Sequence, residues 1–162
     1  MDRAISIRSR LQNSGCEFLT TITADYNEYA YTFCLSCKTD TDGNLNFSVI
    51  KPESVAGISG YLSASGGKLT FEEYALLFST LSEGLLSPVS APWVLLNGLK
   101  SGYISAVGEY NDGLKIEVDE TYEENTLKII VYTDKYDIPI AAEIFDQERR
   151  IIKLDVENFV YL

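Results

Sequence analysis

The sequence contains no histidine and few cationic residues. Without histidine, the Ser/His/Asp and Cys/His catalytic arrangements and most zinc sites with a catalytic water are excluded, because no other unperturbed side chain titrates near neutral pH. The 13 Lys and Arg stand against 24 Asp and Glu, which gives a net charge of −11. Such an acidic surface repels phosphate backbones and anionic lipid headgroups, so nucleic acid is not an expected partner.

Long apolar runs and an N-terminal signal are also missing. No run of 18 or more apolar residues occurs, so we expect no segment to cross a membrane. Residues 1–11 carry Arg3, Arg8 and Arg10 but no uninterrupted apolar stretch, which is not the pattern of a signal peptide. Any export signal is therefore expected upstream of Met1.

Cysteine is scarce, with three residues, which is too few for a disulfide scaffold. The CxxC at Cys34–Cys37 lies in an alternating strand pattern, so its two thiols face opposite sides and a redox role is disfavoured. A tight turn centred on Tyr26-Asn27 would instead place Cys16 opposite Cys37. We predict a Cys16–Cys37 disulfide in an oxidising compartment, with Cys34 free and buried. Two unbonded core thiols in a cytosolic protein are the alternative.

The pattern of apolar residues predicts one domain over residues 1–162. A short helix is expected over residues 2–12, with Ala4, Ile7 and Leu11 on one side. A period of two then predicts a first meander of strands over 16–25, 29–39, 44–50, 55–63 and 68–72. A second meander is predicted over 103–110, 114–119, 126–133, 138–145 and 150–157.

Between the meanders, residues 73–81 fit either a helix or a strand. A helix is predicted over Trp93–Lys100, with Ser90 or Ala91 as its cap and Pro92 in its first turn. Trp93, Leu96 and Leu99 have helical spacing and are expected to pack on the sheet, while Gly98 and Gly102 mark the fraying end. The fold class is α+β, mainly β: about ten antiparallel strands in a large curved sheet with two or three short helices.

Two Asx-Gly loops set predicted hairpin registers. A three-residue loop over Thr41–Gly43, with its glycine in the left-handed conformation, pairs Cys37 with Phe47 and Leu35 with Val49. The same kind of loop over 111–113 would produce the second register, which pairs Tyr110 with Leu114, Gly108 with Ile116, and Ala106 with Val118.

Clusters of acidic residues fit turns better than metal sites. Asp119–Asn125 holds four carboxylates in seven residues, for which a solvated turn is favoured over calcium or a basic partner. Asp40–Asn44 has its glycine at the wrong position for a calcium loop. No pairing of a nucleophile with a base is found, so we expect no catalytic residues, no metal, no cofactor and no enzymatic activity.

Apolar side chains gather on one predicted face of the first meander. They are Phe18, Ile22, Tyr29, Tyr31, Phe33, Leu35, Phe47 and Val49. The helix around Trp93 and the N-terminal helix are the expected covers, and incomplete coverage would leave a groove for an apolar ligand. A filled core without a cavity is the alternative.

Several motifs resemble a known family. They are Val49–Gly60, Gly67–Phe71, Ser87–Pro92, Ile138–Ile144 and Val156–Phe159. Their order is similar to that of Gram-positive, clostridial-type lipoproteins with a LolA-like fold, the group that includes the spore-germination lipoprotein GerS. The resemblance implies a strongly curved antiparallel half-barrel whose concave apolar side is closed by helices. In carriers of that fold this space accepts the acyl chains of lipoproteins.

The resemblance also implies an exported protein tethered by a lipidated N-terminal cysteine. No lipobox precedes Met1, so the anchor and the signal are expected upstream of this chain. We expect a lipid or acyl chain to contact Phe33, Leu35, Phe47, Val49 and Trp93. The alternative is an adaptor with a filled core, in which an exposed sheet edge or the 119–124 loop binds an envelope protein.

Overall fold

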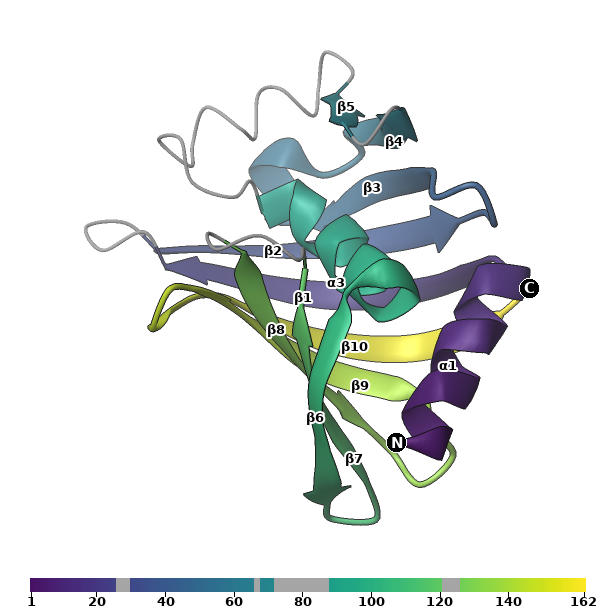
Figure 1. Cartoon of the computed structure of the whole chain (residues 1–162). Helices are drawn as coiled ribbons and strands as arrows, with labels where there is room; N and C mark the ends of the chain where they lie inside the picture. The colour runs from purple at the N-terminus through teal and green to yellow at the C-terminus, as the bar shows by residue number, and fades with distance from the viewer. Residues whose placement is uncertain (26–29, 66–67, 72–87, 121–125) are drawn as a thin grey trace.

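The computed structural model describes residues 1–25, 30–65, 68–71, 88–120 and 126–162 (Figure 1). Three predicted features lie outside these residues: the turn at Tyr26-Asn27, the segment 73–81, and part of the acidic loop, 121–125. The α-helices are α1 (Asp2–Asn13) and α3 (Ala91–Ser101), and the short 3-10 helices are η1 (Glu53–Val55) and η2 (Pro88–Ser90).

The strands form two antiparallel meanders. The first comprises β1 (Cys16–Asp25), β2 (Ala30–Thr39), β3 (Leu45–Lys51), β4 (Ser59–Ser65) and β5 (Lys68–Phe71). The second comprises β6 (Tyr103–Tyr110), β7 (Gly113–Asp119), β8 (Leu127–Thr133), β9 (Pro139–Asp146) and β10 (Arg149–Tyr161).

The two meanders meet at the centre of a single ten-stranded sheet. Its order is β5-β4-β3-β2-β1-β10-β9-β8-β7-β6, so among the described strands only the pairing of β1 with β10 joins elements that are distant in sequence. The sheet curves strongly, with α3 across its concave side and α1 beside the C-terminal end of α3 (Figure 1). The predicted fold class, a mainly β half-barrel closed by short helices, is confirmed.

Strand alternation produces one apolar inner face. On β1, Cys16, Phe18, Thr20 and Ile22 are buried while the residues between them are more exposed. The neighbouring strands repeat this pattern, and their buried side chains form one core cluster with residues of both helices. Burial of these side chains contributes about 1.5 to 3 kcal/mol for each large aliphatic or aromatic residue, which is the main force that holds helices on the sheet.

The helices follow the predicted patterns closely. Helix α1 buries Ala4, Ile7 and Leu11, as expected. Helix α3 begins at Ala91 after Ser90, with Pro92 in its first turn, where a missing N–H breaks no helical hydrogen bond. It ends at Ser101 with Gly102 as its C-cap, within one residue of the predicted end at Lys100, and Gly98 lies within its last turn.

The two helices are bonded to one another at the C-terminal end of α3. Arg8 Nε donates to the carbonyl oxygen of Leu99 at 2.6 Å, and Arg8 Nη2 donates to that of Gly102 at 2.6 Å. Gln12 Nε2 donates to the carbonyl oxygen of Lys100 at 2.8 Å. The last carbonyls of a helix have no partner within the helix, so α1 supplies donors that α3 lacks.

The strand predicted over 55–63 begins later than expected. Residues 53–55 form η1, and Gly57 has a φ of 86°, in the left-handed region that favours glycine. The N–H of Gly57 donates to the carbonyl oxygen of Val49 at 2.9 Å, which holds the chain in a turn before β4 starts at Ser59. A turn stabilised by the preceding strand therefore replaces the first four residues of the predicted strand.

The register of the β2–β3 hairpin is as predicted. Cys37 pairs with Phe47 and Leu35 pairs with Val49. Gly43 has a φ of 85°, in agreement with the left-handed position that the three-residue loop requires.

The predicted register of β1 against β2 is wrong by two residues. Cys16 pairs with Thr39 and Phe18 pairs with Cys37, so Cys16 does not lie opposite Cys37. All three cysteines are free, and the predicted Cys16–Cys37 disulfide is therefore wrong. Cys16 Sγ instead lies 3.2 Å from Thr39 Oγ1, and Cys34 is only half-buried rather than buried.

The predicted register of the β6–β7 hairpin is wrong by one residue. Tyr110 pairs with Gly113 rather than with Leu114, because the connection is a two-residue loop with Asn111 at a φ of 49°. Gly113 therefore belongs to β7, where an added Cβ atom would collide with the carbonyl oxygen of Thr133 on β8. The close approach of two strands, rather than a turn, requires glycine here.

We expect the Gly113→Ala variant to lower the free energy of unfolding by about 1 to 3 kcal/mol, because β7 and β8 must separate to admit the methyl group. Urea unfolding measures this change. Gly108→Ala in the same hairpin is the control, since no atom lies within 4 Å of its added Cβ, and it should change stability by less than about 0.5 kcal/mol. Equal losses in the two variants would contradict the close approach.

The thiols should also differ in reactivity. Burial raises the pKa of the Cys16 and Cys37 thiols, which suppresses their reactive thiolate forms. We expect iodoacetamide to alkylate Cys34 first in the folded protein, and Cys16 and Cys37 only in urea. Peptide mass spectrometry identifies the modified residues, and a reductant-sensitive peptide that links Cys16 to Cys37 would contradict this.

Candidate functional site

Four of the predicted ligand-binding residues lie on the concave face of the sheet. Phe33, Leu35, Phe47 and Val49 are each at most 4% exposed and belong to the core cluster that includes the inner side of α3. The strand pairing therefore brings the predicted residues of β2 and β3 onto one surface. In the structure these four side chains are buried in the core.

Trp93, the fifth predicted residue, is half-buried and packs against the edge of this core. Its Nε1 donates to the carbonyl oxygen of Gly43 at 2.9 Å, which ties α3 to the β2–β3 loop. A hollow of about 20 Å³ beside it is lined by Thr39, Leu96, Asn97 and Lys100 as well. That volume admits about one water molecule, so an acyl chain could enter here only after α3 moves.

The loop beside Trp93 forms the predicted turn. Asp40 Oδ1 accepts hydrogen bonds from the N–H groups of Asp42 at 2.9 Å and Asn44 at 3.1 Å. Burial opposes ionisation of Asp40, but the bonds from Asn44 and Asp42 outweigh it and lower the pKa of Asp40. The carboxylate therefore holds the backbone of the loop.

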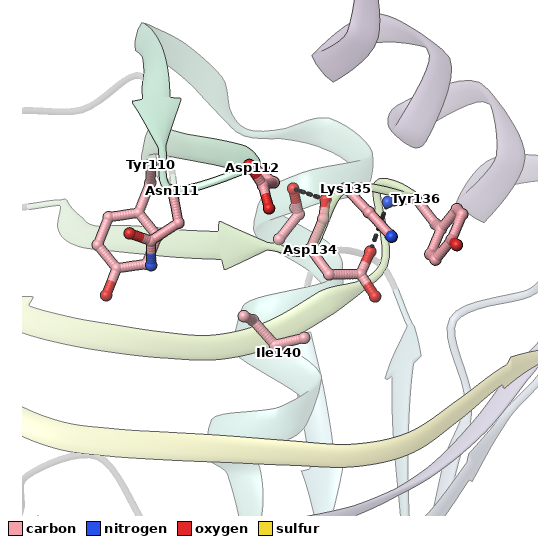
Figure 2. Close-up of a pocket in the computed structure, with 9 residues that line it drawn as sticks. Tyr110, Asn111, Asp112, Asp134, Lys135, Tyr136 and Ile140 are labelled. Atoms are coloured by element: carbon pink, nitrogen blue, oxygen red, sulfur yellow. Dashed lines mark hydrogen bonds between the residues drawn. The ribbon is translucent and has the colours of Figure 1, made fainter.

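Two larger hollows lie away from the concave face. The turn hollow, of about 320 Å³, is formed where the β6–β7 loop meets the turn between β8 and β9 (Figure 2). The tyrosine hollow, of about 350 Å³, lies over β8, β9 and β10. They share Tyr110 and Ile140, which are 43% and 40% exposed. Both volumes are in the range of small-molecule sites.

The turn hollow has a wall that is fixed by its own hydrogen bonds. Asp134 Oδ1 accepts from the N–H of Tyr136 at 2.8 Å and from the N–H of Ile138 at 3.0 Å. Arg3 of α1 forms an ion pair with Asp137 in the same turn. Figure 2 shows Tyr110 and Asn111 on one side of the hollow and Asp134 and Lys135 on the other. The N-terminal helix thus helps to hold the turn in place.

The tyrosine hollow has a small residue between larger ones. Ala141 on β9 pairs with Tyr132 on β8 and with Asp155 on β10, and its side chain leaves space between them. The rings of Tyr110 and Tyr132 lie with their centroids 4.6 Å apart at an angle of 55°. One wall of the hollow is therefore aromatic.

The opposite wall is charged and internally bonded. Glu143 accepts from Tyr132 Oη at 2.8 Å and from Arg150 Nη1 at 2.9 Å. Burial opposes ionisation of Glu143, but the bonds from Arg150 and Tyr132 outweigh it and lower its pKa. Burial and the bond to Glu143 together raise the pKa of Tyr132 to about 12. The wall thus presents a fixed carboxylate and a neutral phenol, with Lys153 and Asp155 completing it.

The sequence analysis missed both hollows. Their residues come from strands that are adjacent only after the whole second meander has paired. The small residue Ala141 opposite Tyr132 could have indicated the tyrosine hollow, but this pairing can be recognised only when the β8–β9 register is known. Among the described residues, no group of three or more cysteine or acidic side chains could hold a metal ion. Neither described helix has the length and apolar character to cross a membrane.

Comparisons with known proteins give similarities of fold. No protein-family profile matches the sequence, and no curated protein matches it. The structure of an uncharacterized conserved protein from Thermus thermophilus is similar over 99% of this chain and 86% of its own, with 11% identity and a TM-score of 0.51. That structure shares the fold.

Two further structures have lower similarity. One is a putative outer membrane lipoprotein-sorting protein domain from Vibrio parahaemolyticus, with 10% identity, coverage of 99% of this chain and 91% of its own, and a TM-score of 0.42. The other is a LolA superfamily protein from Nitrosomonas europaea, with 9% identity, coverage of 96% and 92%, and a TM-score of 0.40.

The bond between Tyr132 and Glu143 can be tested by titration. We expect Glu143→Gln to lower the pKa of Tyr132 from about 12 toward its ordinary value of 10, because the negative charge is lost while the burial stays. In the native protein the neutral phenol is favoured, so its contribution to stability declines as the pH rises above 10. Carbon-13 NMR of the tyrosine rings measures the pKa. Glu157→Gln on β10 should leave it unchanged, and the same pKa in both variants would contradict the assignment.

Proposed function

We propose that this protein is a non-enzymatic binding protein of the cell envelope that takes an apolar ligand, such as a lipid or acyl chain, between its concave sheet face and α3. The observation that carries the proposal is the continuous apolar inner face of a strongly curved sheet, to which α3 adds its own apolar side. Phe33, Leu35, Phe47 and Val49 are the proposed contacts. Such a surface binds hydrocarbon through burial of apolar area without directional bonds.

Trp93 marks the proposed entrance. It stands near the start of α3, where its Nε1 donates to the Gly43 carbonyl, and near the other end of the helix Lys100 Nζ donates to the carbonyl of Asp40 in the same loop at 3.5 Å. The opposite end of α3 has three bonds from Arg8 and one from Gln12. The N-terminal end of α3 is therefore the end from which a ligand would separate the helix from the sheet.

The proposed location is outside the cytoplasm, with the protein attached to the membrane through an anchor upstream of Met1. The resemblance of the sequence to clostridial-type lipoproteins of the GerS-like group supports this location, as does the half-barrel architecture. A Gram-positive envelope protein of this kind need not transfer lipoproteins, because a fold is reused for different ligands. The three free thiols leave the redox state of the compartment open.

A protein-binding adaptor is the second candidate. It is favoured by the tight cover on the four concave-face residues and by β6, which ends the sheet and is largely exposed. An edge strand has unpaired backbone N–H and C=O groups that can pair with a strand of another protein. An envelope protein is the proposed partner in that case.

Lipid titration separates the two candidates. The chain has a single tryptophan, so emission from Trp93 reports directly on the proposed entrance. We expect added lysophospholipid to shift this emission to shorter wavelength and, at about 100 times its Kd, to stabilise the fold by about 2.7 kcal/mol, or to raise the Tm by about 5 to 10 °C. Native mass spectrometry of protein purified without detergent should show a lipid adduct.

Two controls accompany this experiment. Glycerophosphocholine, which has the headgroup without the acyl chain, should produce neither effect. Trp93→Phe should remove the fluorescence signal and keep the rise in Tm, which shows that binding rather than the probe causes it. A lipid-free mass together with an unchanged Tm would reject the lipid proposal and leave the adaptor.

A further inference from the structure

We propose that the tyrosine hollow on the outer face of the sheet binds a neutral oligosaccharide. The site is separate from the concave face, since Tyr132, Glu143 and Lys153 alternate along β8, β9 and β10 with the side chains that are buried in the core. The inference is therefore independent of the proposed lipid ligand. It rests on the shape of the hollow, the chemistry of its two walls and the charge around it.

The aromatic wall suits the C–H face of a sugar ring. Tyr110 is 43% exposed and tilts against Tyr132 at 4.6 Å between centroids, so the pair presents rings to solvent beside the exposed Ile140. Tyrosine combines an apolar ring with a polar tip, which matches a ligand that has apolar C–H faces and hydroxyl edges. The volume of about 350 Å³ is sufficient for one or two sugar units.

The charged wall suits the hydroxyl edges of the same ligand. Glu143 and Asp155 accept hydrogen bonds, whereas Arg150 and Lys153 donate them, and all four line the hollow. The bonds of Glu143 to Tyr132 and Arg150 hold these groups in position before a ligand arrives. Sugar hydroxyls donate and accept at once, so they can satisfy both kinds of group, and bonds to charged partners are the stronger ones.

The charge balance excludes charged ligands. Two carboxylates and two cations line the tyrosine hollow, which makes its wall neutral within a chain of net charge −11. An anionic polymer would be repelled by the whole surface, and a cation would displace Arg150 from Glu143. An acyl chain would strip water from four charged groups without replacing their hydrogen bonds, which is costly.

The position of the hollow also disfavours an extended peptide. Strands β8, β9 and β10 each have a neighbour on both sides, so their backbone groups are used within the sheet. A peptide that adds as a strand needs a free edge. Only side chains can bond a ligand over the middle of the sheet, and a ligand rich in hydroxyl groups meets that condition.

Isothermal titration of the whole chain with chitotetraose and with cellotetraose tests the proposal. We expect saturable binding of at least one of these neutral tetrasaccharides. Preference for chitotetraose would indicate an N-acetylated glycan, and preference for cellotetraose an unacetylated one. Tyr110→Ala should weaken binding at least about tenfold, which corresponds to about 1.4 kcal/mol.

Two matched variants complete the design. Ala141→Leu fills the hollow from an outward-facing strand position and should abolish binding. Tyr103→Ala removes an exposed tyrosine from the other end of the same strand, β6, and should leave binding unchanged. The proposal is overturned if neither tetrasaccharide binds, if an oligogalacturonate binds more tightly than both, or if Tyr110→Ala and Ala141→Leu bind like the native protein.

Discussion

The architecture depends on the pairing of the first strand with the last. Thr20 lies opposite Val156 and Ile22 lies opposite Leu154, so β1 and β10 connect two meanders that each contain only local pairings. Without the pairing of β1 with β10, each meander would be a separate five-stranded sheet with one more free edge. Each sheet would then carry only half of the inner face. Because the connection lies at the centre of the sheet, it also creates the width over which the sheet can curve. The concave side exists as one surface only after the chain ends have met.

Both candidate sites follow from that central pairing, although they use opposite faces. Inward residues of β1–β3 and the inner side of α3 form a largely apolar surface, in which Thr20 and Thr39 are buried polar side chains, and such a surface suits hydrocarbon. On β8–β10, outward-facing positions bring Tyr132, Glu143 and Arg150 together, and the hydrogen bonds of Glu143 to the other two are already formed. A single antiparallel sheet therefore offers two chemically different environments. Their separation by the thickness of one sheet means that occupation of one does not block the other.

The sequence predicted what depends on local patterns. Alternation and helical spacing placed most elements within a few residues of their ends, and Gly43 set the β2–β3 register correctly. Register failed where the loop length was misjudged. The shift of two residues in β1–β2 kept every side chain on its predicted face, since strands alternate with a period of two, but it separated Cys16 from Cys37. The shift of one residue in β6–β7 placed Gly113, rather than Leu114, opposite Tyr110. The outer hollow escaped prediction because it joins residues of four strands, and no short stretch of sequence contains its signal.

The bonds between α1 and α3 determine how the concave side can open. Arg8 and Gln12 fix the last turn of α3 to the N-terminal helix, whereas Trp93 holds its first turn by one bond to the Gly43 carbonyl. In the proposed function, a ligand that entered beside Trp93 would turn α3 about the end that Arg8 and Gln12 hold, and the buried Val94 and Leu95 would have to leave the core. The displacement is then largest near Trp93 and close to zero at Gly102. A ligand of increasing length would widen the opening at one end only, so the space beneath α3 would take the form of a wedge.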